Sequence, residues 1–372
     1  MKEISEQEIL CCLALNNLPS IGPLTALRLY KTAGSASSIL EHSQDICSIM
    51  PDAQPAFVEI IKQMPTYVDE ARRELDFIQK YQIQCLCYKD EDYPMRLKEC
   101  EDAPLLLFCK GNIQLNVQHV VCVVGTRICT EYGRDFCRHF MEDLSLLMPD
   151  TLIVSGLAYG IDINAHVRAL ENNLPTVAVL AHGLDRIYPY AHRTVAKQMI
   201  ESGGLVTEYP SLTNPDPYNF VRRNRIVAGL SDACVVVESR EKGGSLITAE
   251  LANGYNREVF AVPGRVFDSQ SVGCNHLIQQ NKAILLNEAS DFLEYMRWTD
   301  KKKKTIQREL FPELTPDQQI LVKALQGKEE VSMNTLIEQT GFPVQKTTML
   351  LLEMEMKGLV KPLAGLHYRL LD

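Results

Sequence analysis

The sequence has no excess of positive charge, no long apolar run and no secretion signal, and each absence removes a class of protein. Its 372 residues include 38 lysines and arginines against 47 aspartates and glutamates, a formal net charge of -9. A protein that is basic over its whole surface is excluded, so any nucleic-acid site must be a local positive patch. No segment approaches the roughly 18 consecutive apolar residues of a membrane span, and the chain starts with acidic residues where a secretory signal is positive. We therefore expect a cytoplasmic protein with no membrane partner.

Metal-ligand spacing is also absent. The 12 cysteines include no C-x-x-C pair, a spacing that is typical of zinc sites. Cys85 and Cys87 alternate along a predicted strand, while Cys122 and Cys234 lie in apolar, strand-like runs. We therefore expect reduced thiols that pack as small hydrophobic residues, with no metal site and no cofactor.

The length exceeds that of a usual single core, so two or three domains are expected. The first, residues 1–82, is predicted to be helical at 6–16, 24–31, 56–63 and 68–81. The turn from Leu18 to Ala26 resembles a helix-hairpin-helix, whose backbone amides can hold a phosphate, although glycine is usual where Ser20 stands. A Gly-Pro turn between two packed helices is at least as good an interpretation, and both stay open.

Residues 83–297 alternate between predicted strands and helices. The strands are apolar and β-branched, as in a parallel sheet that is covered on both faces, and are expected at 120–124, 152–154, 176–180, 233–237, 259–262 and 283–286. Helices are expected between them at 131–147, 163–172, 191–202, 221–230, 246–256 and 276–281. This alternation predicts an α/β domain with a Rossmann-like, doubly wound, mostly parallel sheet.

The last part of the chain is predicted to be a linker, residues 298–314, and a small domain, residues 315–372. The linker contains a run of four lysines, 301–304, which is typical of a solvated segment. Three helical segments and a two-stranded hairpin then predict a winged helix-turn-helix. Its expected recognition helix, around residues 343–349, carries one lysine and no arginine. A protein-contact role is therefore favoured over the reading of DNA bases.

The polar motifs of the α/β domain follow its strands. Ligands of an open parallel sheet bind at the carboxyl ends of the strands, where helix N-termini attract phosphates. A glycine-rich or cationic loop is expected after each of several strands, and together these loops imply an extended polyanion or nucleotide site. The candidate binding residues are Gly125, Thr126, Arg127, Ser155, Gly156, Phe220, Arg222, Arg223, Asn224, Arg225, Lys242, Gly244 and Ser245.

Two of these motifs have alternative interpretations. Arg222 and Arg225 fall on one face of a predicted helix and would follow one phosphate path, but a solvated basic face paired with glutamates fits the same pattern. Phe220 would stack on a base, a contact that tolerates any base sequence, or would be a core side chain.

Five motifs occur in a fixed order along the chain: Gly-Thr-Arg, Ser-Gly-Leu-Ala-x-Gly-Ile-Asp, Arg-Asn-Arg-Ile, Gly-Ser-Leu-Ile-Thr-Ala and Val-Pro-Gly. This ordered set resembles the DNA-processing protein A (DprA, or Smf) family, and the similarity is strongest over residues 105–290. The resemblance implies a homodimer that binds single-stranded DNA without catalysis and loads the recombinase RecA onto incoming DNA during natural transformation. It also implies that Arg127 grips a phosphate, that residues 223–225 line the pocket, and that the turns at Gly156 and Gly244-Ser245 donate hydrogen bonds.

Three positions depart from the pattern of that family. Val221 stands where proline is frequent, Gly243 where serine is common, and His192 where asparagine is usual. We expect the first two changes to be tolerated, whereas the third puts that part of the pocket in doubt.

Two enzyme classes compete with this interpretation. A nucleotide phosphoribohydrolase with a Rossmann-like nucleotide site would use a P-G-G-x-G-T-x-x-E loop, and Gly243, Gly244 and Glu250 fit that spacing. Leu246 and Ile247 replace its second Gly-Thr, however, which removes a close phosphate approach and a hydroxyl. A NAD-dependent oxidoreductase is disfavoured because the G-x-G-x-x-G fingerprint is missing. His166 and His182 lack an obvious catalytic partner, so we expect structural roles for them and no enzyme activity.

Overall fold

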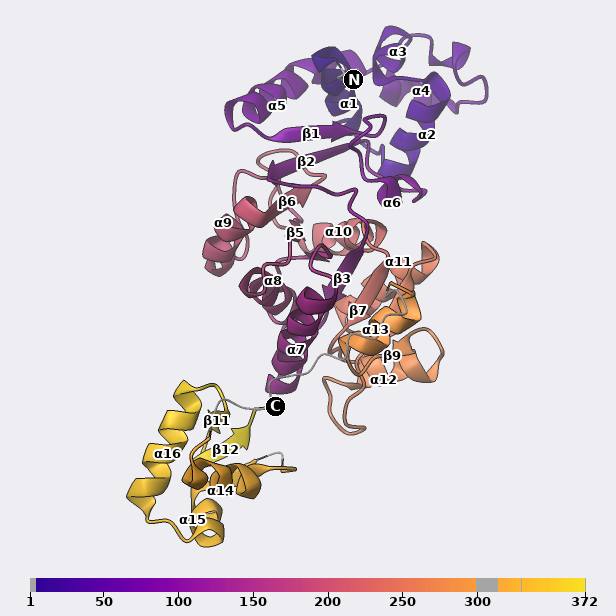
Figure 1. Ribbon diagram of the computed structural model, residues 1–372. Coiled ribbons are helices and arrows are strands. Elements are labelled where there is room, and N and C mark those ends of the chain that lie inside the picture. Colours follow the sequence, from indigo (N-terminus) through magenta and orange to yellow (C-terminus); the bar gives the residue numbers. More distant parts are fainter. Residues whose placement is uncertain (1–4, 299–313, 329, 372) are drawn as a thin grey trace. The chain divides into compact units, whose positions relative to one another are not determined.

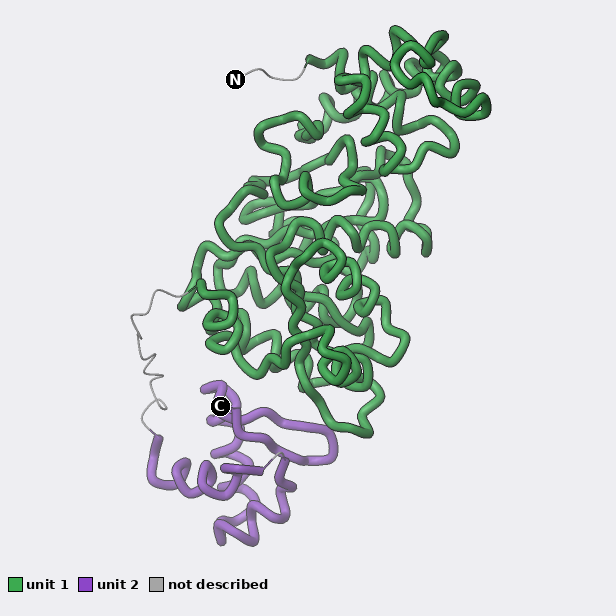
Figure 2. The backbone as a smooth tube through the Cα atoms, turned by 90° about the vertical axis from the view of Figure 1, so that its right-hand side faces the viewer, with its two compact units in different colours: residues 1–299 green, residues 300–372 purple. Residues whose placement is uncertain are grey.

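The computed structural model describes residues 5–298, 314–328 and 330–371. The chain forms two compact units, residues 1–299 and 300–372 (Figure 2). Most of the expected linker, with its four lysines, lies outside the described residues. Within the described residues, every helix is too short or too polar to span a lipid bilayer.

The first unit is built on one nine-stranded sheet with the order β1-β2-β6-β5-β4-β3-β7-β8-β9 (Figure 1). Strands β3 to β9 run parallel, while β2 pairs antiparallel with β6, and β1 with β2. The strands are β1 (Gln84–Cys87), β2 (Leu106–Gly111), β3 (Val120–Val124), β4 (Leu152–Ser155), β5 (Thr176–Val179), β6 (Gly203–Thr207), β7 (Ala233–Val236), β8 (Glu258–Ala261) and β9 (Ile284–Leu285).

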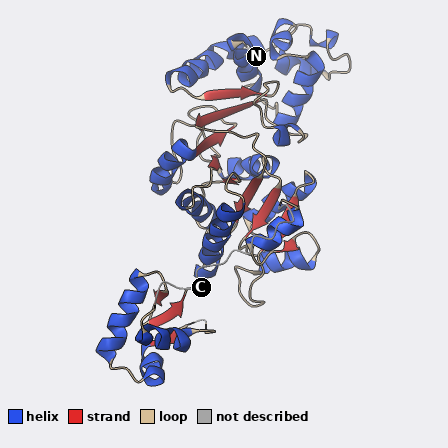
Figure 3. Cartoon of the chain, viewed as in Figure 1, coloured by secondary structure: helices blue, strands red, loops and turns tan. Residues whose placement is uncertain are grey.

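Helices cover both faces of this sheet (Figure 3). Alternate residues of the central strand point to opposite sides: Val120, Cys122 and Val124 lie in one apolar core, and Val121 and Val123 lie in another. A strand buried on both faces needs apolar side chains throughout, which is why β3 has the sequence VVCVV. The predicted doubly wound, mostly parallel α/β fold is therefore confirmed.

One short helix lies between β1 and β2, and from β3 onward helices alternate with the strands. They are α6 (Met95–Lys98), α7 (Glu131–Leu147), α8 (Ile161–Glu171), α9 (Arg193–Ser202), α10 (Pro217–Gly229), α11 (Gly244–Gly254), α12 (Val272–Gln279) and α13 (Ala289–Met296), with the 3-10 turn η3 (Tyr190–His192). Thr130 caps α7 with its hydroxyl, and Asp216 caps α10, whose first residue is a proline.

The N-terminal helices belong to the same unit. They are α1 (Glu6–Asn16), α2 (Pro23–Ala33), α3 (Ala36–Glu41), η1 (Ile46–Ser48), α4 (Pro55–Ile61), η2 (Met64–Tyr67) and α5 (Val68–Lys80). Leu13 and Leu29 share one apolar core with Leu107 and Cys122 of the sheet. The chain changes from helices to strands near residue 82, but side-chain packing continues across that point.

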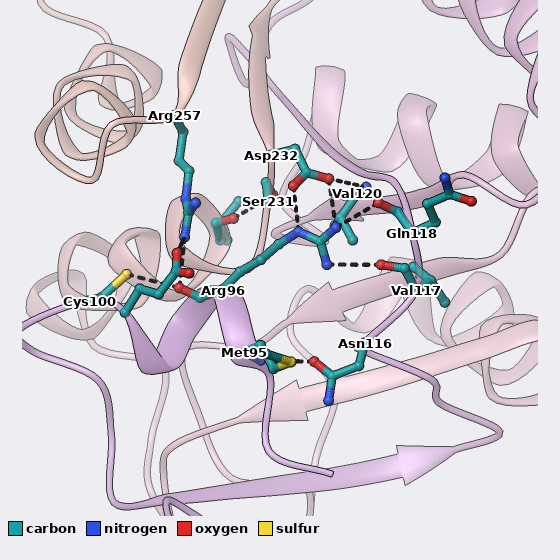
Figure 4. A network of polar contacts seen from close by, with 12 residues as sticks. Met95, Arg96, Cys100, Asn116, Val117, Gln118, Val120, Ser231, Asp232 and Arg257 are labelled. Carbon is teal, nitrogen blue, oxygen red and sulfur yellow. Dashed lines mark hydrogen bonds and ion pairs between the residues drawn. The ribbon is translucent and has the colours of Figure 1, made fainter. Parts of the chain in front are cut away.

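The amino ends of the central strands are held by a polar clamp around Arg96 of α6 (Figure 4). Its Nε and Nη2 atoms donate to the Asp232 carboxylate at 2.6 and 2.9 Å. Nη1 donates to the Val117 carbonyl oxygen at 3.0 Å, and Nη2 also donates to the Gln118 carbonyl oxygen at 2.8 Å. Asp232 also accepts from the Val120 amide at 2.8 Å. The clamp therefore joins α6 to the start of β3 and to the residue before β7.

The second unit has the helices and hairpin that the sequence predicts, so the winged-helix prediction is confirmed. Lys346 of α16 forms an ion pair with Asp317 at 2.7 Å and lies 4.3 Å from the centre of the Phe342 ring. The expected recognition helix therefore has its lysine engaged within the unit. The elements are α14 (Pro316–Leu325), β10 (Val331–Ser332), α15 (Met333–Thr340), α16 (Val344–Met356), β11 (Val360–Leu363) and β12 (His367–Leu370).

Candidate nucleic-acid interface

The loops that follow β3, β4, β7 and β8 bond to one another at the carboxyl edge of the sheet. The Thr126 amide donates to the Glu238 carbonyl at 2.6 Å, and the Thr126 carbonyl accepts from the Ile161 amide at 3.1 Å. The Ser239 amide donates to the Gln270 carbonyl at 2.7 Å. These contacts hold the four polar loops at one edge, as parallel strand ends require.

The glycines of this edge make room for protein atoms. A Cβ on Gly125 would lie 2.5 Å from Ile161 Cγ1, and one on Gly156 would lie 2.4 Å from the guanidinium of Arg223. Gly160 has a φ of 79°, and a Cβ there would lie 2.0 Å from the Thr126 carbonyl oxygen. Gly244, by contrast, begins α11 and has open space around it. Of these four glycines, only Gly244 leaves an approach for a ligand.

Arg127 is the exposed cation of the Gly-Thr-Arg loop. Its guanidinium lies 5.3 Å from the centre of the Phe220 ring, and Phe220 lies 5.7 Å from the Tyr188 ring. Phe220 is half-buried and Tyr188 is 46% exposed. We call Arg127, Tyr188 and Phe220 the Arg127 cluster. It brings together one positive charge and two aromatic rings from three separate loops and helices.

Arg223 lies inside the protein, although the motif places it in the pocket lining. It is 4% exposed, and its Nη1 atom donates to the carbonyl oxygens of Gly156, at 2.7 Å, and Val179. Burial lowers the pKa of Arg223, and the nearby Asp162 carboxylate opposes that change. Arg223 therefore ties α10 to the ends of β4 and β5, and its contact with DNA is not supported.

Arg225 is also buried, at 6% exposure. Its guanidinium pairs with Glu208 and donates to the Asp102 carbonyl at 2.6 Å. Burial raises the pKa of Glu208, and Arg225 opposes that change. The structure therefore gives no support to Arg225 as part of the expected phosphate path along Arg222 and Arg225, because that arginine pairs with a buried carboxylate.

The two serine hydroxyls of the motifs also bond within the protein. Ser155 donates to the Val123 carbonyl at 2.6 Å, and Ser245 donates to the Ser239 hydroxyl at 2.9 Å. Both serines are buried. The remaining candidates reach solvent: Arg127, Lys242 and Gly244 are exposed, and Gly125, Thr126, Phe220, Arg222 and Asn224 are intermediate.

A family model described as "DNA recombination-mediator protein A" matches residues 84–297, and a second one, "DprA winged helix domain", matches residues 309–365. Protein Smf of Escherichia coli is 35% identical over 329 residues, which cover 84% of this chain and 87% of that protein. This chain belongs to the DprA family. DprA of Streptococcus pneumoniae is 39% identical over 250 residues, covering 67% of this chain and 85% of that protein.

Solved structures of DprA proteins share the fold. The X-ray structure of Streptococcus pneumoniae DprA aligns with a TM-score of 0.67 at 32% identity, covering 79% of this chain and 98% of that one. A structure of Helicobacter pylori DprA, whose report concerns its single-stranded DNA binding mode, aligns with a TM-score of 0.53 at 29% identity. It covers 59% of this chain and 97% of that chain.

The His192 departure from the DprA pattern has a structural role. His192 is buried, its Nδ1 atom lies 2.7 Å from the Leu157 carbonyl oxygen, and its ring packs edge-on against Tyr159 at 4.9 Å. It therefore holds the loop after β4 from inside the protein. His166 and His182 likewise bond to protein groups, Thr176 Oγ1 at 2.7 Å and the Gly183 carbonyl at 2.9 Å.

Sequence reasoning missed most of the aromatic side chains around the site. Tyr159, Tyr188, Tyr190 and Tyr218 are 49%, 46%, 73% and 67% exposed. Tyr159 and Tyr188 follow β4 and β5, so a search for aromatic residues just after predicted parallel strands would have found them. Large exposed rings next to an exposed arginine are typical of surfaces that bind unpaired bases.

Proposed function

We propose that this DprA-family protein binds single-stranded DNA, without catalysis, at the carboxyl edge of its sheet. The observation that carries the proposal is the Arg127 cluster, where an exposed guanidinium lies over the ring of Phe220 and the ring of Tyr188 lies beside it. A guanidinium neutralises a phosphate, and aromatic rings stack on unpaired bases of any sequence. The Helicobacter pylori DprA structure, which concerns single-stranded DNA binding, supports the same ligand.

The proposed contact surface is smaller than the set of motif residues. Arg127, Tyr188 and Phe220 form its centre, and Lys242 and Gly244 lie at an exposed turn of the same edge. The buried arginines and serines of the motifs would act indirectly. Arg223, Arg225 and Ser245 bond α10 and α11 to other elements of the unit, and Ser155 bonds β4 to β3. A few surface cations on a chain of net charge -9 suffice for binding only if they are gathered at one place.

The finer role that we propose follows from membership of the DprA family. The protein would act in the cytoplasm as a homodimer, protect incoming DNA and load RecA onto it during natural transformation. A dimer would place two sites on one particle and increase the apparent affinity for long strands. Light scattering at tens of micromolar tests the dimer, and a monomer at that concentration would contradict it.

Binding of labelled oligonucleotides across a range of salt concentrations tests the DNA proposal directly. Fluorescence anisotropy should show tighter binding to single strands than to duplexes of the same length. Affinity for the single strand should fall steeply as salt rises, because phosphate neutralisation releases counterions. Equal affinity for both forms, or affinity that does not change with salt, would overturn the proposal.

The phosphoribohydrolase alternative finds no support in the position of Glu250. This carboxylate is 66% exposed and lies 3.9 Å from Lys282 of the turn before β9. Ser245 of the same loop is buried against Ser239. Incubation with AMP should therefore release no free base, and base release would favour the enzyme.

A further inference from the structure

The loop between β8 and α12, residues 262–271, begins with the Val-Pro-Gly motif and carries an exposed apolar tip. Val266 and Phe267 at the tip are 77% and 101% exposed, so Phe267 is as accessible to solvent as in an extended chain. Single apolar residues at a surface are common. These two are adjacent, however, and they lie at the same edge of the sheet as the Arg127 cluster.

The tip of this loop is held in place by the protein. The Asp268 amide donates to the Arg265 carbonyl at 3.0 Å, which closes a turn with the two apolar residues at its centre. The Asp268 carboxylate accepts from the Gln270 amide at 3.0 Å and from the Ser271 hydroxyl at 3.3 Å. The exposed ring therefore stands on an ordered turn, and a ligand that binds it has less chain to immobilise.

The base of the loop is fixed as well. The Asn275 side chain bonds to both backbone groups of Gly264: Nδ2 donates to the carbonyl at 3.0 Å, and Oδ1 accepts from the amide at 3.2 Å. A Cβ on Gly264 would lie 2.0 Å from Ser271 Oγ. The glycine of the Val-Pro-Gly motif is therefore needed for the loop to fold back on itself and present its tip.

Side chains join this loop to the loops after β3 and β7. The Tyr132 hydroxyl, on the first turn of α7, donates to the Pro263 carbonyl at 2.7 Å, and Tyr132 is 47% exposed. The Gln270 amide lies between two neighbours, 3.0 Å from Thr126 Oγ1 and 3.1 Å from Arg240 Nε. Because β3, β7 and β8 are adjacent in the sheet, the outer two are only about 10 Å apart.

Positive groups lie on the middle loop of these three. The loop after β7 carries Arg240 and Lys242, both exposed, against one exposed carboxylate, Glu241. Gly244 follows at the start of α11 with open space around it, so a phosphate can approach the first turn of this helix. A DNA strand that crosses the three loops therefore meets cations between the rings of the Arg127 cluster and the ring of Phe267.

We propose that single-stranded DNA runs from the Arg127 cluster across the ends of β3, β7 and β8, and that Phe267 stacks on an unpaired base at the far end of this path. Arg240 and Lys242 neutralise the phosphates between the two ends. An aromatic ring stacks on any base, so the second contact lengthens the site without adding a sequence preference. This inference rests on the proposed single-stranded DNA binding and gives that site a direction and a second end.

Loss of the ring is the first test. Phe267→Ala should weaken binding of oligo-dT of about 16 nucleotides about tenfold, within the range that one stacked base contributes. Leu146→Ala is the matched control because Leu146 is 66% exposed near the end of α7, at the opposite edge of the sheet. It should bind as the wild type does in anisotropy titrations. Equal affinities for Phe267→Ala and the wild type would overturn the inference.

A fluorescent ring at the tip reports the contact itself. Phe267→Trp keeps a stacking surface, and a base stacked on an indole quenches its fluorescence. Saturating oligo-dT should therefore lower the emission of this variant well beyond that of the wild type, whose single tryptophan, Trp298, packs against Phe292. The control Leu146→Trp should show no added quenching. Emission of Phe267→Trp that DNA leaves unchanged would contradict the stacking contact.

The salt dependence tests the course of the strand between its two ends. Each phosphate contact on a single strand contributes about 0.7 to the slope of log affinity against log salt. Lys242→Ala should therefore make this slope less steep by about 0.7. Lys282→Ala, in the turn before β9 and so at the opposite edge, should keep the wild-type slope. An unchanged slope in Lys242→Ala would show that the strand does not cross the loop after β7.

A second copy of this chain is the rival occupant of the tip. Light scattering of Phe267→Ala without DNA separates the two, because a residue that only stacks on DNA leaves the mass of the particle unchanged. A lower mass than that of the wild type would overturn the assignment and give the tip to a protein interface. Failure of the proposed function looks different, since the wild type itself would then show no salt-dependent binding of the strand.

Discussion

The two ends of the central strands both carry arginines, but these arginines are used in different ways. At the amino end, Arg96 bonds to a carboxylate and two carbonyl groups, and every contact in its clamp is made by the protein. At the carboxyl end, Arg127 is exposed and lies over the ring of Phe220. The number of protein acceptors around a guanidinium, rather than its presence in a motif, therefore separates structural arginines from those available to a ligand.

The same criterion divides the arginines within α10. Arg223 and Arg225 are buried and bonded to carbonyls or a carboxylate, as Arg96 is. Arg222, one residue away, reaches solvent beside Tyr218. Adjacent residues of a helix point about 100° apart, so Arg222 and Arg223 face different surroundings.

The largest effect should come from removing a buried arginine at the carboxyl end. Arg223→Ala leaves the Gly156 and Val179 carbonyls and the Asp162 carboxylate without their cation. We expect a loss of about 3–5 kcal/mol in the free energy of unfolding, measured by chemical denaturation. The neighbouring Arg222→Ala should lose less than about 1 kcal/mol. Similar unfolding midpoints for the two variants would contradict the assignment of a structural role to Arg223 and not to Arg222.

Arg127→Ala should show the opposite behaviour. Loss of an exposed guanidinium should change the unfolding free energy by no more than about 0.5 kcal/mol. Affinity for oligo-dT should fall by about 1.5–3 kcal/mol, the net value of a hydrogen bond to a charged group. Arg168→Ala, at the far end of α8, is the control and should bind as the wild type does. The assignment fails if both variants have the same affinity in anisotropy titrations.

Acid should destabilise the fold through His166, which bonds to Thr176 at the start of β5. Burial lowers the pKa of His166 from 6.5 to about 3. Below pH 6.5 the unfolded chain takes up a proton that the folded protein accepts only near pH 3, so this contribution to stability is lost as the pH falls through that window. The free energy of unfolding should fall by at most about 1.4 kcal/mol per pH unit, a total loss of about 2 kcal/mol by pH 5.

His166→Gln removes the titrating group and should flatten this part of the stability profile. Urea unfolding of both proteins between pH 7 and about pH 5 measures the difference. Parallel profiles for the two proteins would show that His166 does not titrate in this way.

The smallest effect should come from the aromatic part of the Arg127 cluster. Phe220→Ala should weaken oligo-dT binding by about 1 kcal/mol, the low end of the range for one stacked base, because the ring is only partly exposed. Phe220→Tyr keeps the stacking surface and should bind as the wild type does. If Phe220→Ala lowers stability and leaves affinity unchanged, the ring is a core side chain.

Much of the fold could be predicted because parallel strands buried on both faces need nearly continuous apolar residues. That pattern located β3 at Val120–Val124 with its bounds correct and the other central strands within about one residue. Strand β6 was missed because it begins with Gly203 and Gly204, which resemble a turn. Both glycines are required there, since a Cβ would lie 2.1 Å from the Thr176 carbonyl oxygen or 2.4 Å from that of Lys110.

The sequence by itself determined which loops meet, because the carboxyl ends of parallel strands share one edge. It could not determine which side chains of those loops face solvent. Whether Arg225 is buried and paired depends on Glu208 and Asp102, which lie outside α10 and come close to it only after the sheet and α10 have packed. The spacing of arginines along a predicted helix shows only which of them share a face of that helix. The desolvation and pairing of each charge depend on every element packed around it, and only the tertiary structure brings these elements together.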